Sequence, residues 1–208
     1  MSEEQMSAGI AAAESTPSPS IKGSVFLMGV QGVKRLMSEG RLSREEVEFD
    51  LQSNDIRYLG DKILAGAWYP VTTFVRLVSI AVDAFSDGDL AYLAEQGEAS
   101  AERVLGTQAY QDFVAAASNR RDAAGPGASV LTITQLLLNF GRWELDAGSN
   151  ARHFEIRVTN VGDLPESLRY AGQGFIQHLA SIVAGEPLRV SSERLDQDTI
   201  LYRGPASQ

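Results

Sequence analysis

Cysteine is absent from this chain of 208 residues, and its absence excludes several kinds of site at once. Disulfide bonds, zinc–thiolate centres, iron–sulfur clusters and cysteine nucleophiles all require the missing thiol. Because disulfides persist mainly in oxidising compartments, a chain without them fits the cytoplasm, which is the location we expect.

The chain also lacks a long hydrophobic run. No stretch of roughly 18 or more apolar residues occurs, so we expect no membrane span. Residues 1–20 contain neither Lys nor Arg and only a short apolar stretch, unlike a secretory signal. Their richness in Ser, Ala and Pro predicts a disordered N-terminal tail, followed by a single folded domain over 21–208.

Positive charge is scarce as well. Eighteen Lys and Arg stand against 27 Asp and Glu, which gives a net charge of −9 and an isoelectric point near 4.7. Such a chain repels a phosphate backbone unless it carries a strong local basic patch. We therefore expect no nucleic-acid partner.

The first two thirds of the chain show helical periodicity. Apolar residues recur every three or four positions over 24–37, 71–85, 90–105, 107–114 and 130–140, which predicts helices.

Capping signals mark where some of these helices begin and end. We expect Ser24 to cap the first helix and Gly40 to follow its end, while Ser43 and Glu46 have the spacing of a capping box. Pro70 is expected to open the helix over 70–85, since proline fits a first helical turn. The turn residues Gly125-Pro126-Gly127 predict a polar loop over 119–128.

From Trp143 onward the pattern changes to alternation. Two strand pairs are predicted, one with Trp143 and Leu145 followed by Phe154, Ile156 and Val158, and one with Leu188 and Val190 followed by Ile200 and Tyr202. Between them, Asp163-Leu164-Pro165-Glu166 is expected to open a helix through capping by Asp163 and Glu166, and Gly185 to end it. Helices followed by β-β-α-β-β predict an α+β fold, with a helical layer packed on a mostly antiparallel four-stranded sheet.

Catalytic signatures are missing. The chain has no Gly-x-Ser-x-Gly elbow and no P-loop ending. His153 and Glu155 would share a strand face and could bind a metal, but the pair fits a solvated charged face better, and no third ligand is evident. We expect no metal, no cofactor and no enzymatic activity; an enzyme of unidentified reaction is the less favoured alternative.

His178 lies at the boundary between the apolar and polar faces of its predicted helix. A boundary histidine is most often structural. A neutral imidazole in an apolar cleft could also ligate haem iron or hydrogen-bond a ligand, so a haem-based gas sensor stays open as an alternative.

Aromatic residues from several predicted elements should meet where the helices cover the sheet. Large aromatics are the usual filling of such a layer, and they can also line a pocket for an apolar molecule. With His178, the candidate ligand-binding residues are Trp68, Tyr69, Phe74, Phe140, Trp143, Phe154 and Phe175.

Two segments carry a resemblance to a known family. Trp68-Tyr69-Pro70 enters a buried helix, and the stretch from Trp143 to Arg203 contains a hairpin, the helix with Gly174-Phe175 and a strand pair ending near Tyr202. In this order of elements, Ile21 to Arg203 resembles an uncharacterised bacterial family related to 4-vinyl reductase domains. That wider group shares the fold of haem-nitric-oxide-binding domains and of the small TRAPP vesicle-trafficking subunits.

The resemblance implies a hydrophobic cavity between helices and sheet, used to bind small molecules or to build assemblies. The zinc-binding cysteines of some vinyl-reductase-type sensors and the Tyr-x-Ser-x-Arg haem signature of the gas sensors are missing here. We therefore expect a non-enzymatic small-molecule-binding or regulatory interaction domain, with a hydrophobic small molecule or another protein as its partner.

A homodimer is a further expectation. TRAPP-like domains pair through helices, and the first predicted helix carries an apolar stripe that a disordered tail could not cover. The stripe comprises Phe26, Val30, Val33 and Met37. The same stripe could instead be buried in the chain's own core, and a charge at Val33 would distinguish a split dimer from an unfolded chain.

Overall fold

The computed structural model describes residues 18–86, 89–119, 125–146, 153–162 and 164–205. Its helices are α1 (Gly23–Ser38), α2 (Arg44–Asp50), α3 (Ser53–Ile56), α4 (Val71–Ser86), α5 (Ala91–Leu105), α6 (Gln108–Asn119), α7 (Gly125–Leu137) and α8 (Glu166–Ala184), with a 3-10 turn at Arg57–Leu59. Its strands are β1 (Ser20–Lys22), β2 (Trp68–Pro70), β3 (Arg142–Leu145), β4 (Phe154–Thr159), β5 (Ser191–Asp196) and β6 (Thr199–Gly204).

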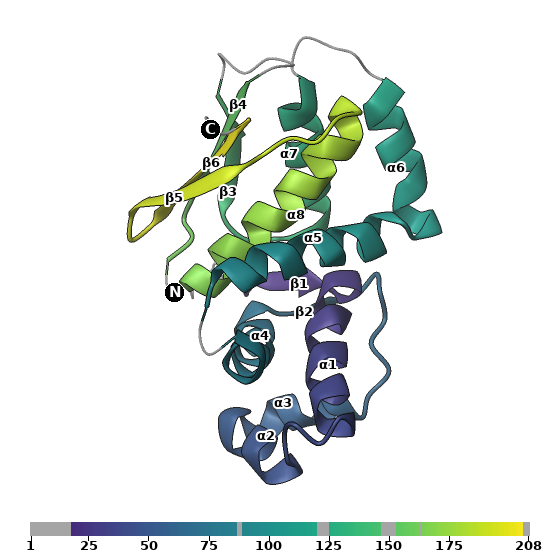
Figure 1. The fold of residues 1–208 in the computed structure, drawn as a ribbon, viewed down its shortest axis with the longest axis vertical. Coiled ribbons are helices and arrows are strands. Elements are labelled where there is room, and N and C mark those ends of the chain that lie inside the picture. Colours follow the sequence, from purple (N-terminus) through teal and green to yellow (C-terminus); the bar gives the residue numbers. More distant parts are fainter. Residues whose placement is uncertain (1–17, 87–88, 120–124, 147–152, 163, 206–208) are drawn as a thin grey trace, which may run out of the picture.

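The main sheet has the order β3-β4-β6-β5, and every pair is antiparallel. Alternation along β4 buries Phe154, Ile156 and Val158, as the sequence predicts. Helices α7 and α8 contribute apolar residues to the same core cluster as these strands (Figure 1). The α+β class and the four-stranded antiparallel sheet are thus confirmed.

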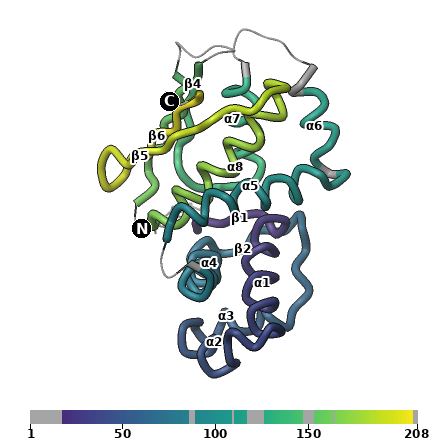
Figure 2. The backbone as a smooth tube through the Cα atoms, viewed as in Figure 1, coloured from purple at the N-terminus to yellow at the C-terminus, as the bar shows by residue number. Residues whose placement is uncertain are grey.

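Helix α5 crosses between the part that holds the sheet and the part that holds α1 to α4 (Figure 2). Two hydrophobic clusters correspond to these parts. The sheet cluster includes Ile133, Ile156, Ile176 and Ile200, and the helical cluster includes Phe26. Helices of the two parts therefore face one another along α5.

The apolar stripe of α1 belongs to the helical cluster. Phe26 and Val33 are fully buried and Val30 is nearly so, packed with residues such as Val47 and Leu77. The chain itself therefore covers the stripe that motivated the dimer expectation. The homodimer itself stays a prediction.

A second, two-stranded sheet was not foreseen. β1 pairs with β2 so that Ile21 lies opposite Tyr69. Pro70 ends β2 instead of opening α4, and the next N–H, of Val71, donates to the carbonyl of Pro19 at 3.0 Å. Strands of three residues are too short to produce a visible alternation. Pro19 and Ser20 thus form part of the fold, while residues 1–17 of the predicted tail lie outside the described residues.

The start of α1 also differs from the expectation. Helix α1 begins at Gly23, and Ser24 is buried within its first turn. The N–H groups of Gly23 and Ser24 donate to the carbonyls of Ala67 and Ala65, at 2.8 and 3.0 Å. A distant loop therefore satisfies the helix end that we expected the Ser24 side chain to satisfy.

Two further expectations need correction. Gly125-Pro126-Gly127 forms the first turn of α7, not a loop, which agrees with the tolerance of proline there. Leu188 and Val190 precede β5, because their N–H groups donate to the side chains of Ser181 and Gln177 on α8.

Helix α8 begins at Glu166 without a side-chain cap, and Asp163 lies outside the described residues. The carboxylate of Glu166 pairs with Arg169 and Arg194. Its expected contact with the start of the helix at Asp163 lies outside the described residues. Other local signals hold: Ser43 and Glu46 form the capping box, and Gly40 and Gly185 adopt the left-handed conformation after their helices.

None of the helices among the described residues combines the length and apolar character that a membrane crossing needs.

Candidate functional site

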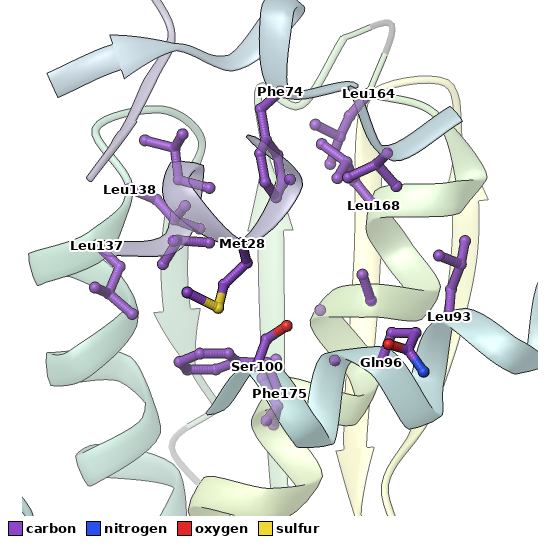
Figure 3. Close-up of a pocket in the computed structure, with 18 of the residues that line it drawn as sticks. Met28, Phe74, Leu93, Gln96, Ser100, Leu137, Leu138, Leu164, Leu168 and Phe175 are labelled. Carbon is purple, nitrogen blue, oxygen red and sulfur yellow. The ribbon is translucent and has the colours of Figure 1, made fainter. Parts of the chain in front are cut away.

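A cavity of about 470 Å³ lies at the junction of the two hydrophobic clusters. This volume falls within the roughly 300–1,000 Å³ typical of small-molecule sites. Helices α1, α4, α5 and α8 supply most of its wall, and α7 and the sheet close its inner end. Figure 3 shows Met28 of α1 extending into the middle of the cavity, toward Ser100 of α5.

The inner end of the cavity is apolar. It is bordered by side chains that are nearly or fully excluded from solvent, among them Leu137, Ile176 and Ile200. Leu164, just before α8, and Leu168, in its first turn, face Phe74 of α4 across the upper part of the space (Figure 3). An apolar molecule in this cavity would contact both hydrophobic clusters.

The polar groups of the lining come mainly from α1 and α5. Gln31 and Arg35 contribute from α1, and Gln96, Ser100 and Arg103 contribute from α5. Gln31, Arg35 and Arg103 are solvent-exposed, so the cavity reaches the surface where these residues border it.

Glu166 holds the wall segment that carries Leu164 and Leu168. Its carboxylate accepts hydrogen bonds from Arg169 and Arg194, each at 2.6 Å, and Arg194 also donates to the carbonyl of Leu164. Burial opposes ionisation of Glu166, but the hydrogen bonds from Arg194 and Arg169 outweigh it and lower the pKa of this carboxyl below its ordinary value. The start of α8 is therefore fixed to β5.

Four of the aromatic residues predicted from the sequence line this cavity: Phe74, Phe140, Trp143 and Phe175. They come from α4, from the segment before β3, from β3 and from α8, so the expected convergence of separate elements holds for these four. Trp143 also donates a hydrogen bond to the carbonyl of Phe140 at 3.2 Å and stacks on Tyr202, with ring centroids 6.1 Å apart.

The other four predicted residues lie outside the lining. Trp68 is 44% exposed, with the ammonium group of Lys22 over its ring. Tyr69 stacks on Phe26 in the helical cluster, and its hydroxyl accepts a hydrogen bond from the N–H of Leu64.

Phe154 is buried in the sheet cluster, against the backbone at Gly127. His178 is half-buried on α8. A binding role for these residues, as for the four that line the cavity, is still a prediction.

The sequence analysis missed the contributions of α1 and α5. A signal for them exists, because small residues recur on both helices at spacings of three or four. Gly29 and Gly32 lie on α1, and Gly97 and Ser100 lie on α5. Small side chains on facing helices leave room between them, which is what a cavity between helices requires.

Metal chemistry has little support. No group of three or more His, Asp or Glu side chains that could hold an ion occurs among the described residues. His153 Nε2 lies 3.8 Å from the carboxylate of Glu155, on the strand face that the alternation placed them both on.

No protein-family model and no curated protein sequence matches the chain. Among solved structures, it is similar to the Fe(II) unliganded form of a point mutant of the H-NOX protein from K. algicida, with 12% identity and a TM-score of 0.58. The match covers 90% of this chain and 97% of that one. A double mutant of Tt H-NOX matches with 11% identity and a TM-score of 0.53, over 90% of this chain and 96% of that one.

The chain therefore has an H-NOX-like fold, the fold that the sequence resemblance to haem-nitric-oxide-binding domains implied. Identities this low establish the fold alone. The relation to 4-vinyl reductase domains and to TRAPP subunits stays a prediction.

The fold raises the question of whether the cavity residues fit a haem. Haem iron in proteins is held by His, Cys, Tyr or a Met–His pair. Neither histidine lines the cavity, and Met28 lacks a histidine partner there. Tyr202 is enclosed, and burial raises the pKa of its phenol well above the ordinary value, which disfavours the phenolate that would bind iron. Tyr92 packs against Phe85 near the surface. The donor set does not fit a haem iron.

Proposed function

We propose that this chain is a ligand-sensing or regulatory domain that binds an apolar small molecule in the cavity between its two hydrophobic clusters. The observation that supports this function best is the cavity itself. It has the volume of a small-molecule site, an apolar inner end and a polar side that reaches the surface.

The position of the cavity suits a sensor. A bound molecule would contact α4 from the helical cluster and α8 from the sheet cluster at the same time. A ligand shifts a conformational equilibrium only through such differential contacts. The proposed function is non-enzymatic, because the cavity lining among the described residues contains no histidine, cysteine or carboxylate for acid–base or nucleophilic chemistry.

Filling the cavity tests this function. Ser100→Leu places a branched apolar side chain in the space beside Phe175 (Figure 3). We expect the wild-type chain to bind one decanol molecule in equilibrium dialysis, and Ser100→Leu to weaken that binding at least about tenfold, a loss of roughly 1.4 kcal/mol. Ala91→Leu is the matched control, since it adds the same group to an exposed position on α5 outside the cavity. Saturable binding that Ser100→Leu leaves unchanged would place the ligand elsewhere.

A haem-based gas sensor is the second candidate, and the similarity to two H-NOX structures favours it. The donor set speaks against it, because both histidines lie outside the cavity lining. We expect haemin titration to give no stoichiometric Soret band. A band that disappears in His178→Ala but persists in His153→Ala would promote this candidate over the apolar-ligand function.

A further inference from the structure

The charged residues of the cavity lining are of one sign, and this bears on the chemistry of the ligand. The chain as a whole has 27 acidic and 18 basic residues. Among the described residues, however, the lining includes two arginines, Arg35 and Arg103, and no Asp, Glu or Lys. The charged side chains of the lining are therefore both positive, in a protein that is negative overall.

The two arginines occupy equivalent places on different helices. Arg35 lies in the last turn of α1 and Arg103 in the last turn of α5. Gln31 and Gln96 add polar groups from the same two helices, whereas the opposite end is bordered by buried residues such as Ile176 and Ile200. The cavity is thus amphipathic, with cationic groups where it opens to the surface and an apolar interior.

Both guanidinium groups have donors left for a ligand. Arg35 lies 3.8 Å from Glu39, longer than a hydrogen bond, and both side chains are about half exposed. The side chain of Arg103 makes no hydrogen bond or ion pair with any residue that the structure describes. By contrast, Arg76 is bound to Asp55 at 2.5 Å and Arg169 to Glu166 at 2.5 Å.

We propose that the ligand is an amphipathic carboxylic acid, whose apolar body fills the cavity and whose carboxylate pairs with Arg35 or Arg103 at the open side. A guanidinium group presents paired N–H donors that match a carboxylate, and such charge-assisted bonds are stronger than neutral ones. This inference deepens the proposed function and rests on it.

Equilibrium dialysis with decanoate, decanol and decyltrimethylammonium tests the inference, since the three probes share one apolar chain and differ in head charge. We expect the wild-type chain to bind decanoate at least tenfold more tightly than decanol, and the cation most weakly. Raising the salt concentration should weaken decanoate binding and leave decanol binding unchanged, because salt screens the charge pair.

Two variants and a control assign the preference to the arginines. The variants are Arg35→Gln and Arg103→Gln. We expect at least one of them to lower the affinity for decanoate about tenfold while the affinity for decanol stays the same. Arg44→Gln removes the same charge from an exposed position on α2, away from the cavity, and should change neither.

The binding results distinguish a failure of the carboxylate inference from a failure of the proposed apolar-ligand function. Equal affinity for acid and alcohol, or an acid preference that survives in both arginine variants, would overturn the carboxylate inference and leave the apolar-ligand function standing. No saturable binding of any of the three probes would overturn both.

Discussion

Two glycines allow α5 and α8 to touch along their backbones. A Cβ atom at Gly174 would come within 1.8 Å of the carbonyl oxygen of Ala94, and one at Gly97 within 2.1 Å of that of Ala171. The contacts are with main-chain atoms, which cannot move aside as a flexible side chain can. Because Gly97 and Ala171 also line the cavity, the same close approach shapes the candidate site.

Gly174→Ala is expected to destabilise the fold strongly. Overpacking in a tight core costs about 1–3 kcal/mol and more when the backbone must shift, so we expect a loss of at least about 3 kcal/mol in the free energy of unfolding, measured with urea. Gly32→Ala is the matched control, because a Cβ there meets nothing within 4 Å. It should be neutral or stabilise α1 by up to about 1 kcal/mol. Equal effects of the two substitutions would refute the close approach.

At the residue level, the sequence predicted the signals that depend only on neighbours in the chain. Gly40, Gly185 and the Ser43–Glu46 capping box behave as their local patterns indicate. Ser24 and Pro70 do not behave as their patterns indicate. The N–H of Ser24 donates to the carbonyl of a remote residue, Ala65, and the N–H that follows Pro70, of Val71, donates to the carbonyl of Pro19. Tertiary partners of this kind leave no trace in local spacing.

At the level of elements, the apolar stripe of α1 fits both a dimer interface and burial in the chain's own core. Val33 is fully buried in the helical cluster, which also contains Val47 and Leu77. An unpaired charge buried there costs several kcal/mol, a large share of the 5–15 kcal/mol that stabilises an ordinary domain. We therefore expect Val33→Glu to abolish the cooperative thermal transition seen by circular dichroism.

The neighbouring exposed residue provides the control. Lys34→Glu also introduces a glutamate on α1 and should leave the chain folded. Light scattering should accompany both variants. If the wild type were a dimer and Val33→Glu gave folded monomers of 22.5 kDa, the stripe would be an interface rather than core.

Long, regular elements were the predictable ones. The alternation of β4 and the order β-β-α-β-β after the helices follow from side-chain periodicity, which burial on one face imposes. The start of β5 was placed too early because Leu188 and Val190 alternate as strand residues do, although α8 side chains take up their N–H groups. The short strands β1 and β2 depend on pairing between segments that are far apart in the sequence.

At the level of the whole molecule, the candidate site is a product of how the parts meet. The sequence indicated large aromatic residues as candidates, and four of them line the cavity. Their side-chain type could not distinguish these from Phe154 or Tyr69, which fill the cores instead. The arginines and glutamines of α1 and α5 were not predicted, since a cavity between helices depends on a packing that only the folded chain defines.

Native mass spectrometry of the freshly purified protein tests the central claim most directly. We predict the 22.5 kDa chain with one small molecule bound noncovalently, released on collisional activation, and no such adduct in Ser100→Leu. Detection of the bare chain alone, both as purified and after incubation with decanol, would contradict a ligand-binding cavity, as would an adduct that Ser100→Leu retains unchanged.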